Sequence, residues 1–431
     1  MISLYMFIAA LVLLMIGFPV AFAFGSSALF VALLTPDVGI DIFRLMPYRI
    51  YGIMQNFTLL AVPLFIFMGL ILEKSKIAEA LLINIGKLFG NVRGGLAIST
   101  VLVGAVLAAS TGIVGASVVM MGIISLPIMM RYGYSKSLAS GTIAASGTLG
   151  QIIPPSIVLI ILGDVMSVSV GDLFRAALAP SLLLVGLYIL YILVISYLNP
   201  EIAPAIPNEA DDRKKVIIQA LISIVPPMLL ITLVLGSIFA GVATPTESAA
   251  FGSVGAIILM LANGSFTFSN LKNSALETVK LTSMIFMILI GATAFSLVFN
   301  EVGGGDLILE FFENDIADAW TFVAIAMLAI FILGFFVDFL EICFIVIPIL
   351  LPIVEVFDID PIWFAILVAM NLQASFLTPP FGFALFYLKG SAGDLVSTKD
   401  IYKGVIPFII LQLVTLFIII LFPEIVSVFL D

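Results

Sequence analysis

The sequence GTLGQIIPP, residues 147–155, lies in the middle of a long apolar stretch and ends in two adjacent prolines. The sequence ASFLTPP, residues 374–380, has the same character in the second half of the chain. Proline lacks a backbone N–H, clashes with the preceding helical turn and pushes the residue before it out of the helical region. Each Pro-Pro pair therefore predicts a break inside a helix, which leaves several backbone carbonyls without a helical partner.

The composition around these breaks is that of a membrane protein. Of the 431 residues, 62% are apolar and 10% are charged, whereas soluble domains are about 45–50% apolar and about 25% charged. Apolar runs long enough to cross a bilayer recur from Leu4 to Leu430, which predicts an all-α polytopic membrane protein. Since lipid cannot satisfy free carbonyls, those released by the prolines must face protein, water or an ion.

Several classes of function are excluded by what the sequence lacks. A single cysteine, Cys343, and the absence of histidine exclude disulfides, haem ligation and most zinc sites. The sequence has neither a GxxxxGK[ST] phosphate-binding loop nor a GxSxG nucleophile motif. We therefore expect no enzyme activity, no organic cofactor, no direct use of ATP and no nucleic-acid partner.

Charged residues and Pro/Gly clusters divide the chain into predicted membrane spans. Two apolar stretches, 97–130 and 319–354, are longer than one span and are interrupted in the middle, so each is either one long helix or a re-entrant hairpin. The remaining stretches predict nine crossings, at 3–34, 50–72, 136–163, 172–198, 216–240, 245–263, 281–300, 360–388 and 404–427.

The positions of the basic residues favour the hairpins. With the N-terminus in the cytoplasm and both stretches re-entrant, 14 of the 17 basic residues lie inside, and only Arg44, Arg49 and Arg175 lie outside. Cytoplasmic loops are enriched in Lys and Arg, so this arrangement obeys the positive-inside rule. With nine crossings, this arrangement places the acidic loop 301–318 and the C-terminus outside and the N-terminus in the cytoplasm.

An internal repeat relates the two halves. A shift of 225 residues places Pro127 on Pro352 and the first Pro-Pro pair on the second. We expect two inverted-topology repeats, each with a re-entrant hairpin, a broken transmembrane helix and a short amphipathic helix, at 76–89 and 306–318. The predicted units are a first repeat 1–198 (hairpin 97–130, broken span 136–163), a cytoplasmic linker 199–215, an inverting span 216–244 and a second repeat 245–431 (hairpin 319–354, broken span 360–388).

The breaks are the candidate binding sites. Released carbonyls together with the hydroxyls of Thr111 and Thr378 would make an all-oxygen environment for a hard cation such as sodium. The helices that restart after Pro155 and Pro380 would present free N–H groups to an anion. Ordinary proline kinks, satisfied by neighbouring helices, are the alternative interpretation.

Polar side chains near the breaks extend the list of candidates. Asp338 and Glu341 are the acids predicted inside the bilayer, where they could complete a cation site, carry a proton, pair with an arginine of a partner or remain hydrated at a hairpin tip. The residues predicted to line a substrate are Ser110, Thr111, Asp338, Asn371 and Gln373.

Four segments resemble a known family. The sequence GVATPTESAA, residues 241–250, is similar to the GxATPTEAA stretch of the large membrane subunit (DctM type) of TRAP transporters, the tripartite ATP-independent periplasmic transporters. GFPVA at 17–21, GGLA at 94–97 and GQIIPPS at 150–156 also resemble that family. The resemblance extends over the whole chain.

This resemblance implies an elevator-type, sodium-coupled subunit of the ion-transporter superfamily in the bacterial inner membrane. It implies two partners, a small four-helix membrane subunit and a periplasmic substrate-binding protein, and a small organic acid such as a C4-dicarboxylate as substrate. A self-sufficient symporter and an ion or solute channel remain as alternatives. The implied sodium ligands are Ala108, Thr111, Gly150, Ile153 and Pro155 at one site and Gly334, Ser375 and Thr378 at a second.

Overall fold

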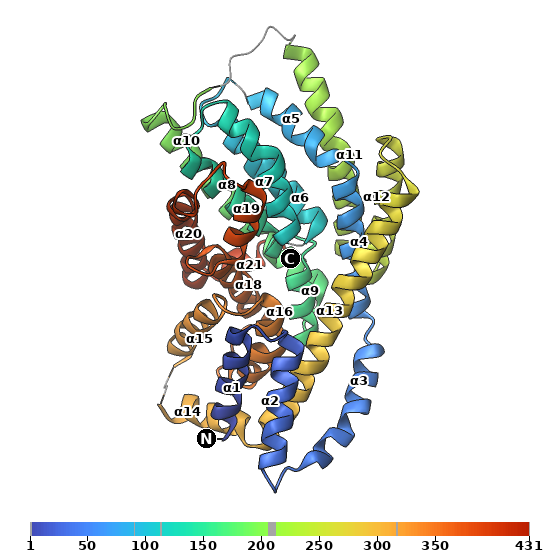
Figure 1. Cartoon of the computed structure of the whole chain (residues 1–431), viewed down its shortest axis with the longest axis vertical. Helices are drawn as coiled ribbons and strands as arrows, with labels where there is room; N and C mark the ends of the chain where they lie inside the picture. The colour runs from blue at the N-terminus through green and yellow to red at the C-terminus, as the bar shows by residue number, and fades with distance from the viewer. Residues whose placement is uncertain (1, 90, 113, 206–212, 316–317, 431) are drawn as a thin grey trace.

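The computed structural model describes residues 2–89, 91–112, 114–205, 213–315 and 318–430, and all regular elements in these ranges are helical. They form an elongated bundle (Figure 1). The first half contains α1 (Ile2–Ile16), α2 (Val20–Leu34), η1 (Ile40–Leu45), α3 (Met46–Met54), η2 (Thr58–Leu60), α4 (Ala61–Lys74), α5 (Ile77–Phe89), α6 (Gly95–Thr111), α7 (Val114–Arg131), α8 (Lys136–Thr148), η3 (Leu149–Gln151), α9 (Ile157–Val165) and α10 (Val170–Leu198).

The second half has a similar order of elements. It contains α11 (Arg213–Phe239), α12 (Pro245–Ala262), α13 (Phe268–Glu301), α14 (Gly304–Asp315), α15 (Ala319–Leu333), α16 (Phe339–Glu341), the π-helix η4 (Ile342–Val346), α17 (Ile347–Val356), α18 (Pro361–Leu377), α19 (Phe383–Ala392), α20 (Thr398–Leu421) and α21 (Glu424–Ser427).

The described helices confirm a polytopic membrane protein. Seven of them are long and apolar enough to cross a bilayer. An eighth span is possible if the segments 40–54 and 58–74, bent by 63° at a short break, cross together. Both interrupted stretches form helix pairs, α6 with α7 and α15 with α16–α17, and both amphipathic segments form separate helices, α5 and α14.

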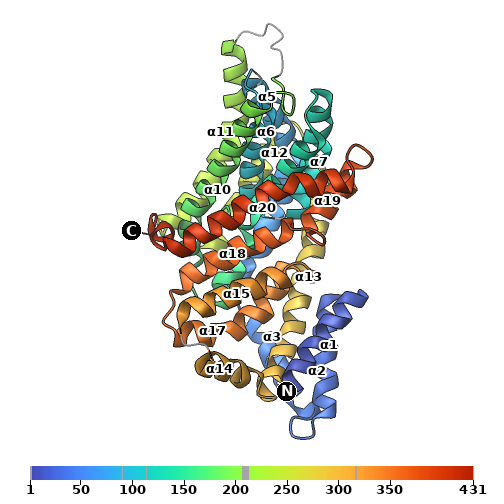
Figure 2. The ribbon, with the colours of Figure 1, turned by 90° about the vertical axis from the view of Figure 1, so that its left-hand side faces the viewer.

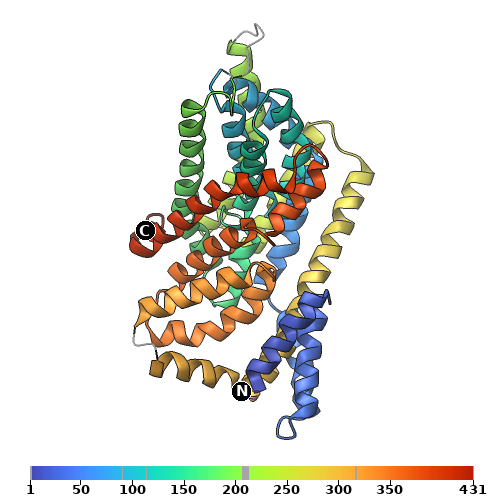
Figure 3. The ribbon, with the colours of Figure 1, turned by 60° about the vertical axis from the view of Figure 1, so that its left-hand side comes forward.

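The prediction of a single crossing over residues 3–34 is wrong. Gly17, with φ of +98°, ends α1, and the N–H of Phe18 donates to the Leu13 carbonyl at 3.1 Å, as in a Schellman turn. The chain then reverses after Pro19, so that α1 and α2 pack side by side as an antiparallel pair (Figure 3). The apolar run is long enough for two short helices, and the Gly-Phe-Pro sequence supplies the turn between them.

The N-terminus consequently lies on the side of the acidic helix α14. The ring centroid of Phe7 lies 6.3 Å from that of Phe295, near the C-terminal end of α13. Ser3 also lines the same cavity as Phe299 of α13 and Leu307 of α14. A cytoplasmic N-terminus is therefore incompatible with an outside loop 301–318. Moving the N-terminus to the outside leaves every basic residue on the side predicted for it above, because α1 and α2 contain no Lys or Arg.

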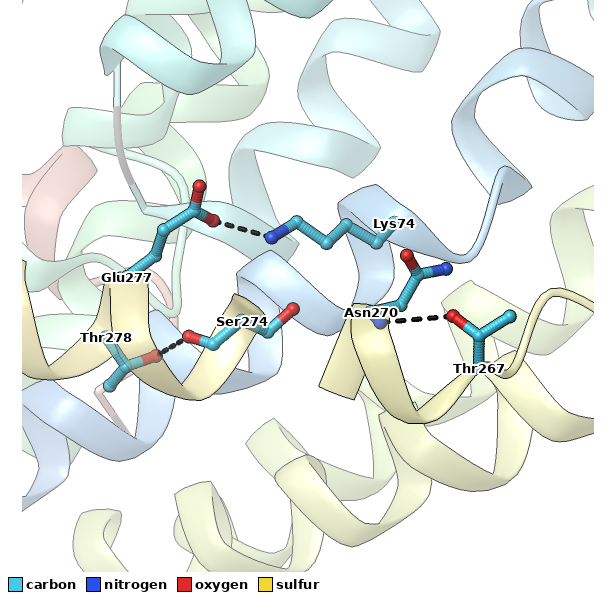
Figure 4. A network of polar contacts seen from close by, with 6 residues as sticks. All are labelled: Lys74, Thr267, Asn270, Ser274, Glu277 and Thr278. Carbon is cyan, nitrogen blue, oxygen red and sulfur yellow. Dashed lines mark hydrogen bonds and ion pairs between the residues drawn. The ribbon is translucent and has the colours of Figure 1, made fainter. Parts of the chain in front are cut away.

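One group of helices packs around α4. Helices α4 and α12 run parallel and in register, because Thr246 donates to the Phe57 carbonyl at 2.7 Å at one end and Asn263 donates to the Ser75 carbonyl at 2.6 Å at the other. Lys74 pairs with Glu277 of α13 at 2.7 Å, nearly three helical turns beyond the Thr267 cap (Figure 4). Helix α2 packs closely on α13, and α11 packs on α12.

A second group surrounds α8. Helix α20 crosses α8 with backbone against backbone, since a Cβ at Gly141 would meet the Gly404 backbone. Helices α6 and α7 flank α8, while α15, α18 and α20 pack one against the next (Figure 2). This second group contains both predicted broken spans.

Candidate functional site

Both predicted helix breaks are present. After η3 the chain is irregular until Ser156, whose side chain caps α9 and also donates to the Gln151 carbonyl at 2.7 Å. Helix α18 ends at Leu377, and α19 begins only at Phe383, beyond the second Pro-Pro pair. Both Pro-Pro peptide bonds are cis. The breaks therefore lie where the steric properties of proline place them.

The first break lies against the first hairpin. A Cβ at Gly150 would lie 3.6 Å from both the Cα and the carbonyl oxygen of Ala108, so the two backbones face each other without a side chain between them. Gly112, with φ of +60°, ends α6 and donates its N–H to the Ala108 carbonyl at 3.1 Å. Ile153 and the buried Pro155 belong to the irregular segment. The structure thus brings Ala108 and Gly150 together.

The second break lies against the second hairpin in the same way. Gly334, at the end of α15, packs on the Ser375 hydroxyl with no room for a Cβ. Ser375 donates to the Leu372 carbonyl and Thr378 to the Ala374 carbonyl, each at 2.8 Å. Both hydroxyl oxygens keep lone pairs that a cation could use. Gly334, Ser375 and Thr378 therefore lie close to one another, and their role in binding sodium stays a prediction.

The proposed substrate residues differ in their surroundings. Ser110 and Thr111 end α6, but their side chains lie outside the described part of the structure. Asn371 donates to the Met327 carbonyl at 2.6 Å and so joins α18 to α15. Gln373 is fully buried, and neither atom of its amide has a hydrogen-bond partner among the described residues. Of these residues, Gln373 has the free polar atoms expected of a binding residue.

Three buried polar residues were missed by the sequence reasoning. Within the described part of the chain, the amide of Gln151 of η3 has no hydrogen-bond partner. Gln412 of α20 approaches Thr148 at 3.4 Å, but its amide oxygen has no partner there either. The hydroxyl of fully buried Tyr188 lies near the amides of Gln373 and Gln412. An isolated glutamine inside the apolar run of α20 was the available signal. Tyr188, Gln373 and Gln412 thus form a polar cluster that reaches Thr148, at the end of α8.

The two acids of the second hairpin have different environments. Asp338 is partly buried and accepts the Phe339 N–H at 2.7 Å, capping the short helix α16. Glu341 is only 2% exposed, and one of its carboxyl oxygens has no hydrogen-bond partner in the part of the chain that the structure describes. It faces Phe7 and Phe24 of the α1–α2 pair. The interpretation of Glu341 as a hydrated tip residue is therefore wrong, because the N-terminal helices cover it.

Comparison with known proteins identifies the family. The family model described as "Tripartite ATP-independent periplasmic transporter, DctM component" matches residues 7–425. The C4-dicarboxylate TRAP transporter large permease protein DctM of Pseudomonas aeruginosa is 30% identical over 407 residues, which cover 93% of this chain and 91% of that protein. The sialic acid TRAP transporter large permease protein SiaM of Vibrio cholerae is 28% identical over 416 residues, 96% of this chain and 94% of the relative.

A solved structure agrees at the level of the fold. This chain aligns with the crystal structure of the Alcanivorax borkumensis YdaH transporter over 91% of each of the two chains. The TM-score is 0.63, and the sequence identity is 14%. The likeness supports the same all-helical membrane architecture. With the family match over nearly its whole length, this chain belongs to the DctM component family of the tripartite ATP-independent periplasmic transporters.

Proposed function

We propose that this protein is the large permease of a sodium-coupled importer for a small organic acid in the bacterial inner membrane. A periplasmic binding protein would deliver the solute, and a small four-helix membrane subunit would enlarge the fixed part of the complex. The names of the relatives support this class of substrate, because C4-dicarboxylates and sialic acid are both carboxylates.

The observation that carries the proposal is the contact of each hairpin with a broken helix. Ala108 faces Gly150 at one break, and Gly334 faces Ser375 at the other. The atoms that could bind a cation at these contacts are backbone carbonyl and hydroxyl oxygens, which suit a hard monovalent cation. Sodium would be held by Ala108, Thr111, Gly150, Ile153 and Pro155 and by Gly334, Ser375 and Thr378, and it would supply positive charge and a gradient that drives uptake of an anion.

The packing also supports a division into moving and fixed parts. We assign α6–α10 and α15–α20 to a carried unit, because α20 packs on α8 through Gly141 and Gly404. Helices α1–α4 and α11–α13 would form the scaffold, and α5 and α14 would connect the two parts. The carried unit of the proposed elevator mechanism thus consists of the two hairpins, the two broken spans and the helices α10 and α20.

The α1–α2 pair changes the number of crossings counted in the first of the two proposed repeats. If α1 and α2 each cross, the segments α1–α10 and α11–α20 contain five crossings each, counting a bent or broken pair once. An odd number of crossings inverts the second repeat directly, with α11 as one of its own helices. This topology places both termini in the periplasm and retains the inside location of 14 of the 17 basic residues.

Reconstituted vesicles test the proposal. Uptake of succinate and N-acetylneuraminate would be measured with the two partner proteins present or omitted, and with or without an inward sodium gradient. We expect uptake that needs both partners and the gradient. Uptake by the isolated chain would indicate a self-sufficient symporter, and flux without sodium coupling would indicate a channel; either result contradicts the proposal.

A further inference from the structure

A cleft of about 640 Å³ lies between the bent segment η1–α3 and the helices α9 and α13. One wall is a single face of α3, which carries Tyr48, Arg49 and Gly52 at helical spacing. The opposite side is formed by Thr293 of α13 and Asp164 near the end of α9. The cleft therefore lies where the proposed scaffold meets the proposed carried unit.

Arg49 is the unpaired base of the proposed outer face. Arg44 forms an ion pair with Asp41 at 2.9 Å. Arg175 lies 3.7 Å from Asp172 and also donates to the Phe239 carbonyl. Arg49 has no ion pair and no hydrogen-bond partner among the described residues. Its guanidinium is thus available to an anion that enters the cleft, and guanidinium groups bind carboxylates through two parallel hydrogen bonds.

Asp164 lies in the same cleft but is held by another residue. Its Oδ1 accepts a hydrogen bond from the Asn56 side chain at 2.5 Å, while Asn56 Oδ1 accepts the Thr58 N–H at 2.9 Å. Asp164 forms no ion pair with Arg49, although both side chains line the cleft. A base and an acid that share a cleft without pairing fit a ligand with an anionic group and a separate hydrogen-bond donor.

We propose that this cleft is an outer receiving site for a carboxylate that also bears a hydroxyl, amide N–H or ammonium group. Arg49 binds the carboxylate, and the free carboxylate oxygen of Asp164 accepts the hydrogen bond from the second group. An unsubstituted dicarboxylate is disfavoured, because its second charge would face Asp164. The inference rests on the proposed function for the direction from which the solute comes, and it narrows the substrate class to substituted organic acids.

Thiol labelling in the cleft tests this site without transport. Gly52 has open space around the position of a Cβ, so Gly52→Cys in a Cys343→Ser background places one reactive thiol beside Arg49. The purified full chain in nanodiscs would be labelled with a membrane-impermeant maleimide. We expect N-acetylneuraminate and malate to slow the labelling, and succinate to require about tenfold higher concentrations because it lacks the hydroxyl.

Matched variants identify the groups responsible. Adding Arg49→Gln should raise the protecting concentration about tenfold or more, whereas Arg44→Gln removes the same charge from an already paired position and should change nothing. Asp164→Asn keeps an acceptor for Asn56 but removes the charge, so it should reduce the difference between malate and succinate. Absence of protection, or equal protection in the Arg49→Gln variant, would overturn the proposal.

Two further outcomes separate a solute site in the cleft from a lipid site and from the transport step. If a phospholipid headgroup were bound to Arg49, Arg49→Gln would change the labelling rate without solute in phospholipid nanodiscs but not in a phosphate-free detergent. Solutes would then give no protection from labelling. That result would contradict a solute site. Because the assay needs neither sodium nor partners, sodium-driven uptake without protection would refute this site alone. Protection without uptake would refute the proposed function alone.

Discussion

The Thr378 hydroxyl oxygen is the proposed side-chain sodium ligand whose role at the second break can be tested most directly. Its proton is used by the Ala374 carbonyl at 2.8 Å, so only its lone pairs are free for a cation. We expect Thr378→Val to raise the sodium concentration for half-maximal uptake about 3- to 10-fold, since one ligand is lost. Titration of uptake against sodium measures this effect.

Thr415 supplies the control for that substitution. Its hydroxyl makes the same bond to the carbonyl four residues earlier, Leu411, also at 2.8 Å, but it belongs to α20 and not to the second break. Thr415→Val should leave the sodium dependence unchanged. Equal shifts in both variants would assign the effect to helix geometry and would remove the Thr378 hydroxyl from the proposed sodium site.

Gln373 allows a structural role to be separated from a functional one. Its buried amide makes no hydrogen bond to the described residues, although the Tyr188 hydroxyl lies near it. Replacing an unsatisfied polar group with an apolar one of similar shape is close to neutral or stabilising. We expect Gln373→Met to leave the melting temperature in detergent unchanged or higher while sodium-driven uptake falls about tenfold or more. A lower melting temperature with normal uptake would instead assign Gln373 to packing.

At the residue level, the sequence predicted what local sterics decide. The positions of both breaks follow from the Pro-Pro pairs, because proline acts on its own turn. The opposition of Ala108 and Gly150 followed from a family resemblance and not from local rules. Tyr188 and Gln412 could not be predicted, since α10 and α20 approach the breaks through tertiary packing that a single sequence does not specify.

At the element level, α1 and α2 were misinterpreted for a physical reason. A Gly-Pro interruption in an apolar run indicates a kinked span, a re-entrant hairpin or a turn between two helices, and charge normally decides between them. The segments α1 and α2 contain no charged residue, so no such criterion existed. The stretches 97–130 and 319–354 do fold as the helix pairs α6–α7 and α15–α17, and charged segments flank both of them. Their re-entrant course in the membrane stays a prediction.

The α1–α2 pair predicts the location of the N-terminus. A periplasm-active reporter fused to the N-terminus should be active, as should one inserted at Gly303, because both points lie at the C-terminal end of α13. A reporter at Asn199 should read as cytoplasmic, because the linker that follows it ends in three basic residues, Arg213 to Lys215. A cytoplasmic N-terminus with an outside Gly303 would contradict this arrangement.

At the scale of the whole molecule, the test is whether the two groups of helices move against each other. Phe24 of α2 and Ile345 of η4 line one small void, together with the buried Glu341. Phe24 belongs to the proposed scaffold and Ile345 to the proposed carried unit. A movement between the units must therefore separate these two residues, and a covalent link between them must prevent it.

We expect a disulfide between Phe24→Cys and Ile345→Cys, in a Cys343→Ser background, to stop sodium-driven uptake and its reduction to restore it. The control pair is Phe57→Cys with Thr246→Cys, two scaffold positions joined by a hydrogen bond of 2.7 Å. Since both belong to the scaffold, their disulfide should leave uptake unchanged. Full uptake with the first link closed would mean that α2 and the second hairpin do not move apart, and solute would then have to cross through a rigid protein.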